Sequence, residues 1–217
     1  MPAVWAVVVA AGTGERFGRH KQFALLDGVP VAARAVTACR SVAGAVVLVA
    51  PAGCDDSYGA DVVVTGGATR SASVRAGLAA VGPEAEVVVV HDAARPLAPP
   101  ESFAAVVGAL ADGRADGAIC ALAVADTLKR VAPPLGPGSA SLVRSTLERA
   151  DLVAVQTPQA FVADVLRRAH ADGGEATDDA ALVEALGATV RVVPGDPRNL
   201  KLTSPADLVV AESLLRA

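Results

Sequence analysis

Short apolar runs rich in valine and alanine recur along the chain, and they alternate with longer segments whose apolar residues follow helical spacing. The runs are residues 4–9, 45–49, 61–64, 86–90, 117–124 and 189–193, each too short to form a helix. Helices are predicted between them at residues 30–40, 69–81, 101–111, 161–171, 177–186 and 204–215. Strands that are apolar on both faces and alternate with helices are typical of a mostly parallel sheet covered on both sides. The pattern therefore predicts an α/β fold.

One stretch, residues 126–151, interrupts this alternation. A tip rich in proline and glycine at residues 132–140 lies between two segments that could be extended. Such a tip between strands is typical of a projecting arm, not of a second domain. Because no linker separates two cores, we expect residues 1–217 to form a single domain that carries this arm.

Composition narrows the classes of partner. The 217 residues are 53% hydrophobic, which is enough for one substantial core and excludes a disordered protein. The net charge is −4 and the aromatic content only 3%, so neither a broad basic surface nor a platform of stacking rings for nucleic acid is expected. If this protein binds phosphate, a few placed residues must do so.

The N-terminal segment, the longest apolar runs and the cysteines are the places where a signal peptide, a membrane span and a metal or disulfide site would be found, and none of these is expected. No Lys or Arg precedes the apolar run at the N-terminus, so we interpret that run as a buried strand and not as a signal peptide. Nowhere do 18 apolar residues follow one another, so no membrane partner is expected and a cytoplasmic location is the default. Three widely spaced cysteines make a zinc site or a disulfide framework an unfavourable interpretation.

The densest chemical signal follows the first predicted strand, in the loop at residues 9–22. Gly12 and Gly14 let the backbone approach a ligand closely, and N–H groups in such a turn can hold phosphate. The spacing matches neither the dinucleotide fingerprint nor the P-loop. Arg16 and Lys21 add two cations to the loop of an otherwise acidic protein. The alternative interpretation is a tight turn with solvated charges.

A second signal is a carboxylate, Asp92, directly after the fourth predicted strand. Ligands of open parallel sheets bind at this edge, so Asp92 is a candidate for holding a divalent cation that bridges phosphate oxygens, with Arg95 for a second anion. Alternatively, Asp92 caps the next helix. For His91, a satisfied core histidine is the favoured interpretation.

Two further places stand out, the pair Gly66-Gly67 with Ser73, and Lys201 before the last helix. Taken separately, the glycine pair can be an ordinary turn and Lys201 an ordinary surface lysine. They become candidates for a binding site only in combination with the first loop.

Six segments in this order resemble a known family: residues 10–16 with 21–22, 91–96, 126–130, 156–159, 177–178 and 199–203. The chain is similar, over essentially its whole length, to the cytidylyltransferases of the non-mevalonate isoprenoid pathway, which act on 2-C-methyl-D-erythritol 4-phosphate. The resemblance implies a Rossmann-like α/β fold and attack of the sugar-alcohol phosphate on the α-phosphorus of cytidine triphosphate (CTP), with release of pyrophosphate. A phosphate monoester is already largely ionised at neutral pH, so this reaction needs no general base.

The resemblance also implies a role for each matching residue. Arg16, Lys21 and Lys201 would be the catalytic cations. The nucleotide would be bound by Ala10, Ala11, Gly12, Gly14, Gly67 and Ser73, and the second substrate by Arg95, Thr127, Arg149 and Thr157. Asp92 would hold Mg²⁺. In a homodimer, the arm would deliver Arg149 into the neighbouring subunit's site.

The sequence departs from the family at three positions. His20 and Val9 stand where the family usually has proline, and Ala68 stands where an acidic residue is common. His20 frees one backbone dihedral beside Lys21, and Ala68 removes a carboxylate near the base. We expect activity to survive, with weaker discrimination between bases.

Three alternatives stay open. A sister enzyme acting on ribitol 5-phosphate shares the fold, and Arg149, Thr157 and the Asp126-Thr127 pair favour the methylerythritol substrate. A dinucleotide-binding oxidoreductase would need an acidic residue closing the second main strand, where Pro51 stands. A binding module without catalysis would tolerate loss of the cations, which are all present.

Overall fold

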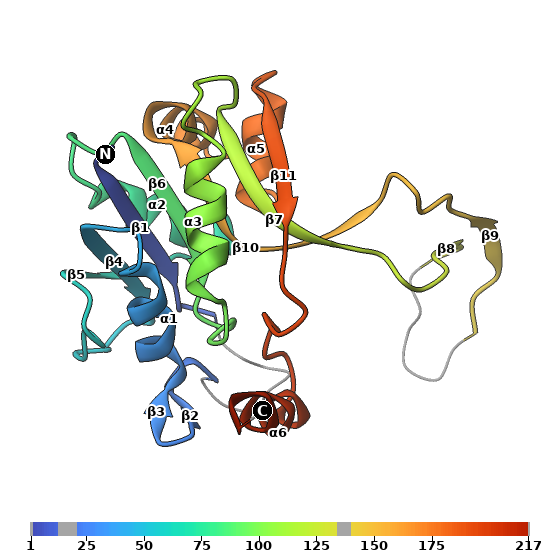
Figure 1. Cartoon of the computed structure of the whole chain (residues 1–217), viewed down its shortest axis with the longest axis horizontal. Helices are drawn as coiled ribbons and strands as arrows, with labels where there is room; N and C mark the ends of the chain where they lie inside the picture. The colour runs from blue at the N-terminus through green and yellow to red at the C-terminus, as the bar shows by residue number, and fades with distance from the viewer. Residues whose placement is uncertain (1, 13–20, 134–139, 217) are drawn as a thin grey trace.

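The computed structural model describes residues 2–12, 21–133 and 140–216, and a single large sheet forms its centre (Figure 1). Seven strands lie in the order β11-β7-β10-β6-β1-β4-β5. Their bounds are β1 Val4–Val9, β4 Ala45–Ala50, β5 Val62–Thr65, β6 Val87–Asp92, β7 Gly117–Ala123, β10 Val153–Val162 and β11 Val190–Pro194. All neighbours pair in parallel except β10, which is antiparallel to both β6 and β7. The predicted mostly parallel α/β fold is confirmed.

Helices cover both faces of this sheet, because successive side chains of a strand point to opposite sides. On β1, Val4, Ala6 and Val8 pack in the core under α1 (Val31–Cys39) and α3 (Pro100–Gly108). Val7 packs on the other face, under α2 (Arg70–Ala79), α4 (Ala163–Ala171) and α5 (Asp179–Ala185). The sheet is therefore buried on both sides.

A third, smaller cluster lies beyond one end of the sheet. There α6 (Pro205–Arg216) lies beside the hairpin of β2 (Leu25–Leu26) and β3 (Val29–Pro30), which follows the short 3-10 helix η2 (Lys21–Phe23). Leu26, Val31, Leu202 and Ala211 form its buried core. The cluster anchors the segment that carries Lys201, and Figure 1 shows it below the lower ends of β1 and β6.

The predicted elements agree with the observed ones to within a few residues. The helix predicted from residue 161 begins two residues later, at Ala163, because Phe161 and Val162 end β10 and pair with Val88 and Val87. No strand was predicted over residues 153–162, since Pro158 and three polar residues interrupt the apolar pattern. Pairing between β10 and β7 shifts between Val155 and Gln159, so Pro158 lies where no ladder hydrogen bond is required of it.

The stretch at residues 126–151 projects away from the sheet (Figure 1). Its described part contains β8 (Lys129–Val131) and β9 (Val143–Thr146), which pair in antiparallel fashion. Residues 134–139 at the tip lie outside the described residues. In the ranges that the structure describes, no helix combines the length and the apolar character that crossing a membrane requires.

Candidate active site

A cavity of about 380 Å³ opens where β1, β5 and β6 end. The segment after β1 is drawn against its neighbours by two bonds, from Ala10 N–H to the Val49 carbonyl (2.8 Å) and from Ala93 N–H to the Val9 carbonyl (3.0 Å). Seven of the predicted site residues line this cavity: Ala10, Ala11, Gly12, Gly67, Ser73, Asp92 and Lys201. Ala68, one of the departures from the family pattern, lines it as well. The structure thus brings together residues that lie nearly 200 positions apart in the sequence.

The paired glycines are required because other segments of the chain approach both of them closely, the loop after β1 at Gly66 and the first turn of α2 at Gly67. A Cβ at Gly66 would lie 2.2 Å from the Cβ of Ala11, and one at Gly67 would lie 2.5 Å from the Cβ of Ala72. The Ser73 hydroxyl accepts from Gly67 N–H at 3.1 Å and donates to the Thr69 carbonyl at 2.9 Å. Ser73 therefore shapes the loop as well as lining the cavity.

A second cavity, of about 280 Å³, adjoins the first and is lined by Arg95 and Thr157. Arg95 donates from Nη1 to the Asn199 carbonyl at 2.7 Å, which ties it to the segment before Lys201. Three charged residues line both cavities: Arg70, Asp92 and Lys201. A group bound in one cavity would therefore meet a group bound in the other at these side chains.

Asp92 is the electrostatic centre of this boundary. Its carboxylate accepts from Arg70 Nε at 3.2 Å through Oδ1 and from Lys201 Nζ at 2.7 Å through Oδ2. Burial would raise the pKa of Asp92, but the positive charges of Arg70 and Lys201 hold that pKa well below its usual range. The carboxylate is therefore ionised at every physiological pH. The alternative role, capping the next helix, is excluded because α3 begins eight residues later, at Pro100.

A chain of hydrogen bonds fixes the strand ends behind Asp92. The Arg95 carbonyl can only accept, so the His91 Nε2 at 3.2 Å carries a proton and the His91 Nδ1 is an acceptor. Thr157 Oγ1 then donates to this Nδ1 (3.1 Å) while it accepts from Asp92 N–H (3.0 Å). Burial lowers the pKa of His91 to about 4, against weaker opposing effects of Asp92 and the Arg95 carbonyl. His91 is thus the buried, satisfied histidine that was favoured, and Thr157 can offer a ligand only an acceptor.

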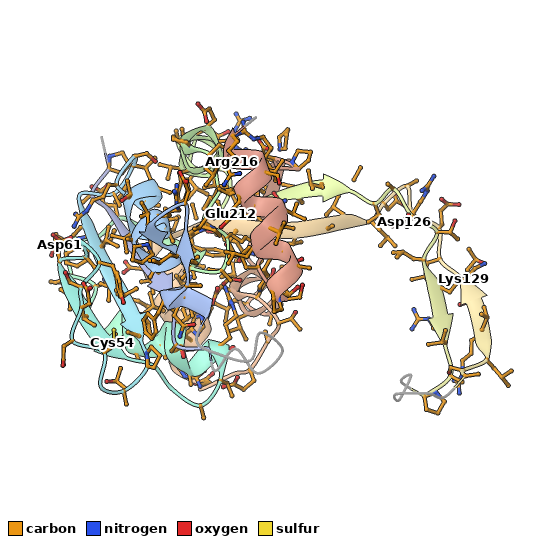
Figure 2. All side chains as sticks on the ribbon, turned by 90° about the horizontal axis from the view of Figure 1, so that it is seen from below. Cys54, Asp61, Asp126, Lys129, Glu212 and Arg216 are labelled. Carbon is orange, nitrogen blue, oxygen red and sulfur yellow. The ribbon has the colours of Figure 1, made fainter. Side chains whose placement is uncertain are left out.

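Five predicted site residues are not among the described residues that line these cavities. Gly14 and Arg16 lie outside the described residues, as does the side chain of Lys21, whose backbone begins η2. Thr127 and Arg149 are exposed residues of the arm, and Arg149 donates to the carbonyl of Ala125, the residue just before the arm. Figure 2 shows two neighbouring arm residues, Asp126 and Lys129, far to one side of the sheet.

Sequence reasoning missed Arg70 and its buried partner Asp179, which lie 2.8 Å apart. A signal for Arg70 was present, because it is the first residue of α2, where the helix dipole disfavours a cation. A cation there needs a carboxylate partner from elsewhere in the fold. Asp179, in the first turn of α5, is that partner, and no local motif of the sequence links it to Arg70.

Comparison with known proteins identifies the family of this chain. The family model described as IspD, 2-C-methyl-D-erythritol 4-phosphate cytidylyltransferase, matches residues 4–217. The chain belongs to this family. Family members of the same description from Streptomyces avermitilis and Rhodococcus opacus are 45% and 46% identical, over 97% and 98% of this chain and 90% and 95% of theirs. The crystal structure of the family member from Thermus thermophilus superposes with a TM-score of 0.81 at 37% identity and covers all of both chains.

Family membership confirms the predicted resemblance and accounts for the fold. A site with two adjoining cavities, separated by one carboxylate and two cations, can hold two anionic substrates side by side. In the described residues it offers neither a Ser-His-Asp nor a Cys-His set, since His91 is committed to Thr157 and the Arg95 carbonyl. The charged groups that line both cavities are of the kind that position anionic substrates and neutralise charge.

Proposed function

We propose that this chain transfers the cytidylyl group of CTP to 2-C-methyl-D-erythritol 4-phosphate, forming 4-diphosphocytidyl-2-C-methyl-D-erythritol and pyrophosphate in isoprenoid precursor biosynthesis. The observation that carries this proposal is the meeting of two cavities at Asp92 and Lys201 in a member of the cytidylyltransferase family. Each substrate takes one cavity, and the reacting phosphates meet at the boundary.

The nucleotide takes the larger cavity. Its cytosine lies by Gly67 and Ser73, where backbone carbonyls can accept from the exocyclic amine that uracil lacks. Its phosphates extend toward Ala10, Ala11 and Gly12, at the start of the loop that carries Gly14, Arg16 and Lys21.

The sugar-alcohol phosphate takes the smaller cavity, with Arg95 as its cation and Thr157 as an acceptor for a hydroxyl. An oxygen of this phosphate attacks the α-phosphorus of CTP, and the bond to the bridging oxygen of pyrophosphate breaks. Lys201 and the loop cations neutralise the charge that accumulates on the transferring group.

The donor set at Asp92 fits Mg²⁺. The described ranges contain no cluster of three or more His, Cys, Asp or Glu side chains, so protein ligands alone would not complete an octahedral site. Mg²⁺ is commonly held by one or two carboxylates together with substrate phosphates and water, and the ionised Asp92 provides one such carboxylate. When bound, the ion would neutralise phosphate charge at the reacting centre.

The arm supports a homodimer with exchanged arms. Leu142 and Val143 on the arm are 79% and 61% exposed, and a two-stranded hairpin with such exposed apolar residues is marginal in water on its own. A second copy would cover them and receive Arg149, with Thr127 on the same arm, near its sugar-alcohol phosphate. We also propose a cytoplasmic location.

Pyrophosphate release tests the proposed reaction. The purified chain is incubated with CTP and Mg²⁺ plus either 2-C-methyl-D-erythritol 4-phosphate or ribitol 5-phosphate. We expect release with the first substrate, and release only with ribitol 5-phosphate would overturn the substrate assignment.

For the dimer, mixing an Arg149→Ala chain with an Arg16→Ala chain should restore activity, because one of the two sites then has both arginines. No recovery in verified heterodimers would contradict arm exchange.

A further inference from the structure

Arg70 connects the boundary between the two cavities to the buried interior of the protein. Its Nε donates to Asp92 Oδ1 at 3.2 Å, and its Nη1 donates to Asp179 Oδ2 at 2.8 Å. The other oxygen of Asp179 accepts from the His170 Nε2 at 3.0 Å. The Asp179 and His170 side chains are only 1% and 3% exposed. A continuous chain of charged and polar groups thus runs from Lys201 in the site to His170 in the core.

The two ends of this series of charged and polar groups differ in whether they reach the cavities. Arg70 lines both cavities, whereas Asp179 and His170 line neither. An effect of Asp179 on the reaction is therefore indirect, and Arg70 is the cavity-lining side chain to which it is paired. Burial would lower the pKa of Arg70, but its two carboxylate partners raise it, so the guanidinium stays charged. A planar guanidinium held at two corners has a fixed orientation, which a lysine ammonium would not have.

We propose that Arg70 is a positioning residue, which holds Asp92 in the orientation needed for transfer and is itself held in place by Asp179 and His170. Arg70 donates to Oδ1 of Asp92, so Oδ2 points toward Lys201 and accepts from its ammonium group. Without this restraint the Asp92 carboxylate can rotate and engage Lys201 with both oxygens, which withdraws the ammonium from the reacting phosphates. This inference rests on the proposed function, because the positioned group serves that reaction.

The same helix provides a matched control in Arg75. Its Nη1 donates to the Gly174 carbonyl and its Nη2 to Glu175 Oε1, each at 2.8 Å. Arg75 therefore links α2 to the segment between α4 and α5 much as Arg70 links α2 to α5, but it lines neither cavity. Its replacement measures the cost of losing such a link without disturbing Asp92.

The test compares Arg70→Lys, Asp179→Asn, their double variant and Arg75→Lys in the full-length chain. Steady-state kinetics give kcat and the KM of each substrate, and circular dichroism melts give the folded fraction at the assay temperature. Because a displacement of about 1 Å can cost 10²-fold in rate, we expect Arg70→Lys and Asp179→Asn each to lower kcat by about 10- to 100-fold. Both KM values should change less than about threefold, and Arg75→Lys should stay within about twofold of the unmodified chain.

The double variant decides whether the two residues act as one unit. We expect its kcat to be about as low as that of the worse single variant, because both changes release the same carboxylate. If the losses multiply, or if Asp179→Asn keeps the unmodified kcat per folded molecule, the inference is overturned. A rise of either KM without a fall of kcat would overturn it as well. If Arg70→Lys does not fold, Asp179→Asn alone decides. Failure of the proposed function is seen separately, as absence of pyrophosphate release by the unmodified chain.

Discussion

Acidification should destabilise this protein through His91, because its imidazole is buried in the neutral form. The ring is fully buried, and its Nδ1 must remain an acceptor for the Thr157 hydroxyl. In the unfolded chain the same imidazole is free to take up a proton with its ordinary pKa of 6.5. Folding therefore excludes a proton that the unfolded chain binds, and stability falls as pH decreases.

The size of the effect follows from the two pKa values of His91. The folded pKa is lowered to about 4, chiefly by burial, so the stabilising contribution is fully present above pH 6.5 and is lost as pH falls toward 4. One pKa unit corresponds to 1.36 kcal/mol, which gives a total of about 3 kcal/mol. By the same relation the loss is about 1 kcal/mol at pH 5.5 and about 2–3 kcal/mol at pH 4.5. The titration of Asp92 does not fall in this pH range, because its pKa is held far lower.

The measurement is urea unfolding at fixed protein concentration between pH 7.5 and 4.5, for the unmodified chain and a His91→Gln variant. The variant is less stable at neutral pH because it loses ring contacts, such as the edge-on contact with Phe103. Since Gln does not titrate, the difference in unfolding free energy between the two chains should shrink by the amounts given above as pH falls. Parallel curves, or an imidazole NMR signal of folded His91 that titrates near pH 6.5, would refute the reasoning.

Three further changes test other features of the site and core. Gly66→Ala should lower the free energy of unfolding by about 1–3 kcal/mol and weaken CTP binding measured by calorimetry, because the new Cβ would overlap Ala11. Gly108→Ala is the control, because the space around Gly108 is open, and it should not lower the free energy of unfolding. Iodoacetamide should modify only Cys54 in the native protein, since the other two thiols are buried; mass spectrometry showing equal labelling of all three would contradict this. Asp92→Asn should lower kcat by at least about 10²-fold, because Lys201 loses the carboxylate that positions it and Mg²⁺ loses its proposed carboxylate ligand; unchanged turnover would remove Asp92 from the reaction.

The sequence predicted those parts of the fold in which local pattern and tertiary environment agree. Strands β1, β4 and β6 are buried on both faces, so their uninterrupted valines were a sufficient signal. Strand β10 could not be found, because its polar and proline residues are tolerated only through the shift in its pairing with β7. The pattern of apolar residues contains no information about such a shift.

The candidate site was predicted where a residue lies in a recognisable motif. Asp92 and Lys201 were identified in this way, and the structure brings their side chains within 2.7 Å of each other. Arg70 was missed because its importance comes from partners 22 and 109 positions away, which no local motif links to it. Which cation faces which carboxylate is decided by where the fold places the first turns of α2 and α5 and the end of β6.

The reversed direction of β10 determines where the arm can be attached. Antiparallel neighbours can be joined directly, whereas a parallel pair needs a crossover to the opposite edge of the sheet. Because β10 runs against β7, the chain leaves β7 and re-enters β10 at the same edge, the one where Asp92 and Thr157 lie. Insertions or deletions in this connection would lengthen or shorten the arm by roughly 3.3 Å for each pair of residues, one in each strand, without displacing a strand of the sheet. The reach of the arm can therefore vary in evolution independently of the reaction centre beside its base.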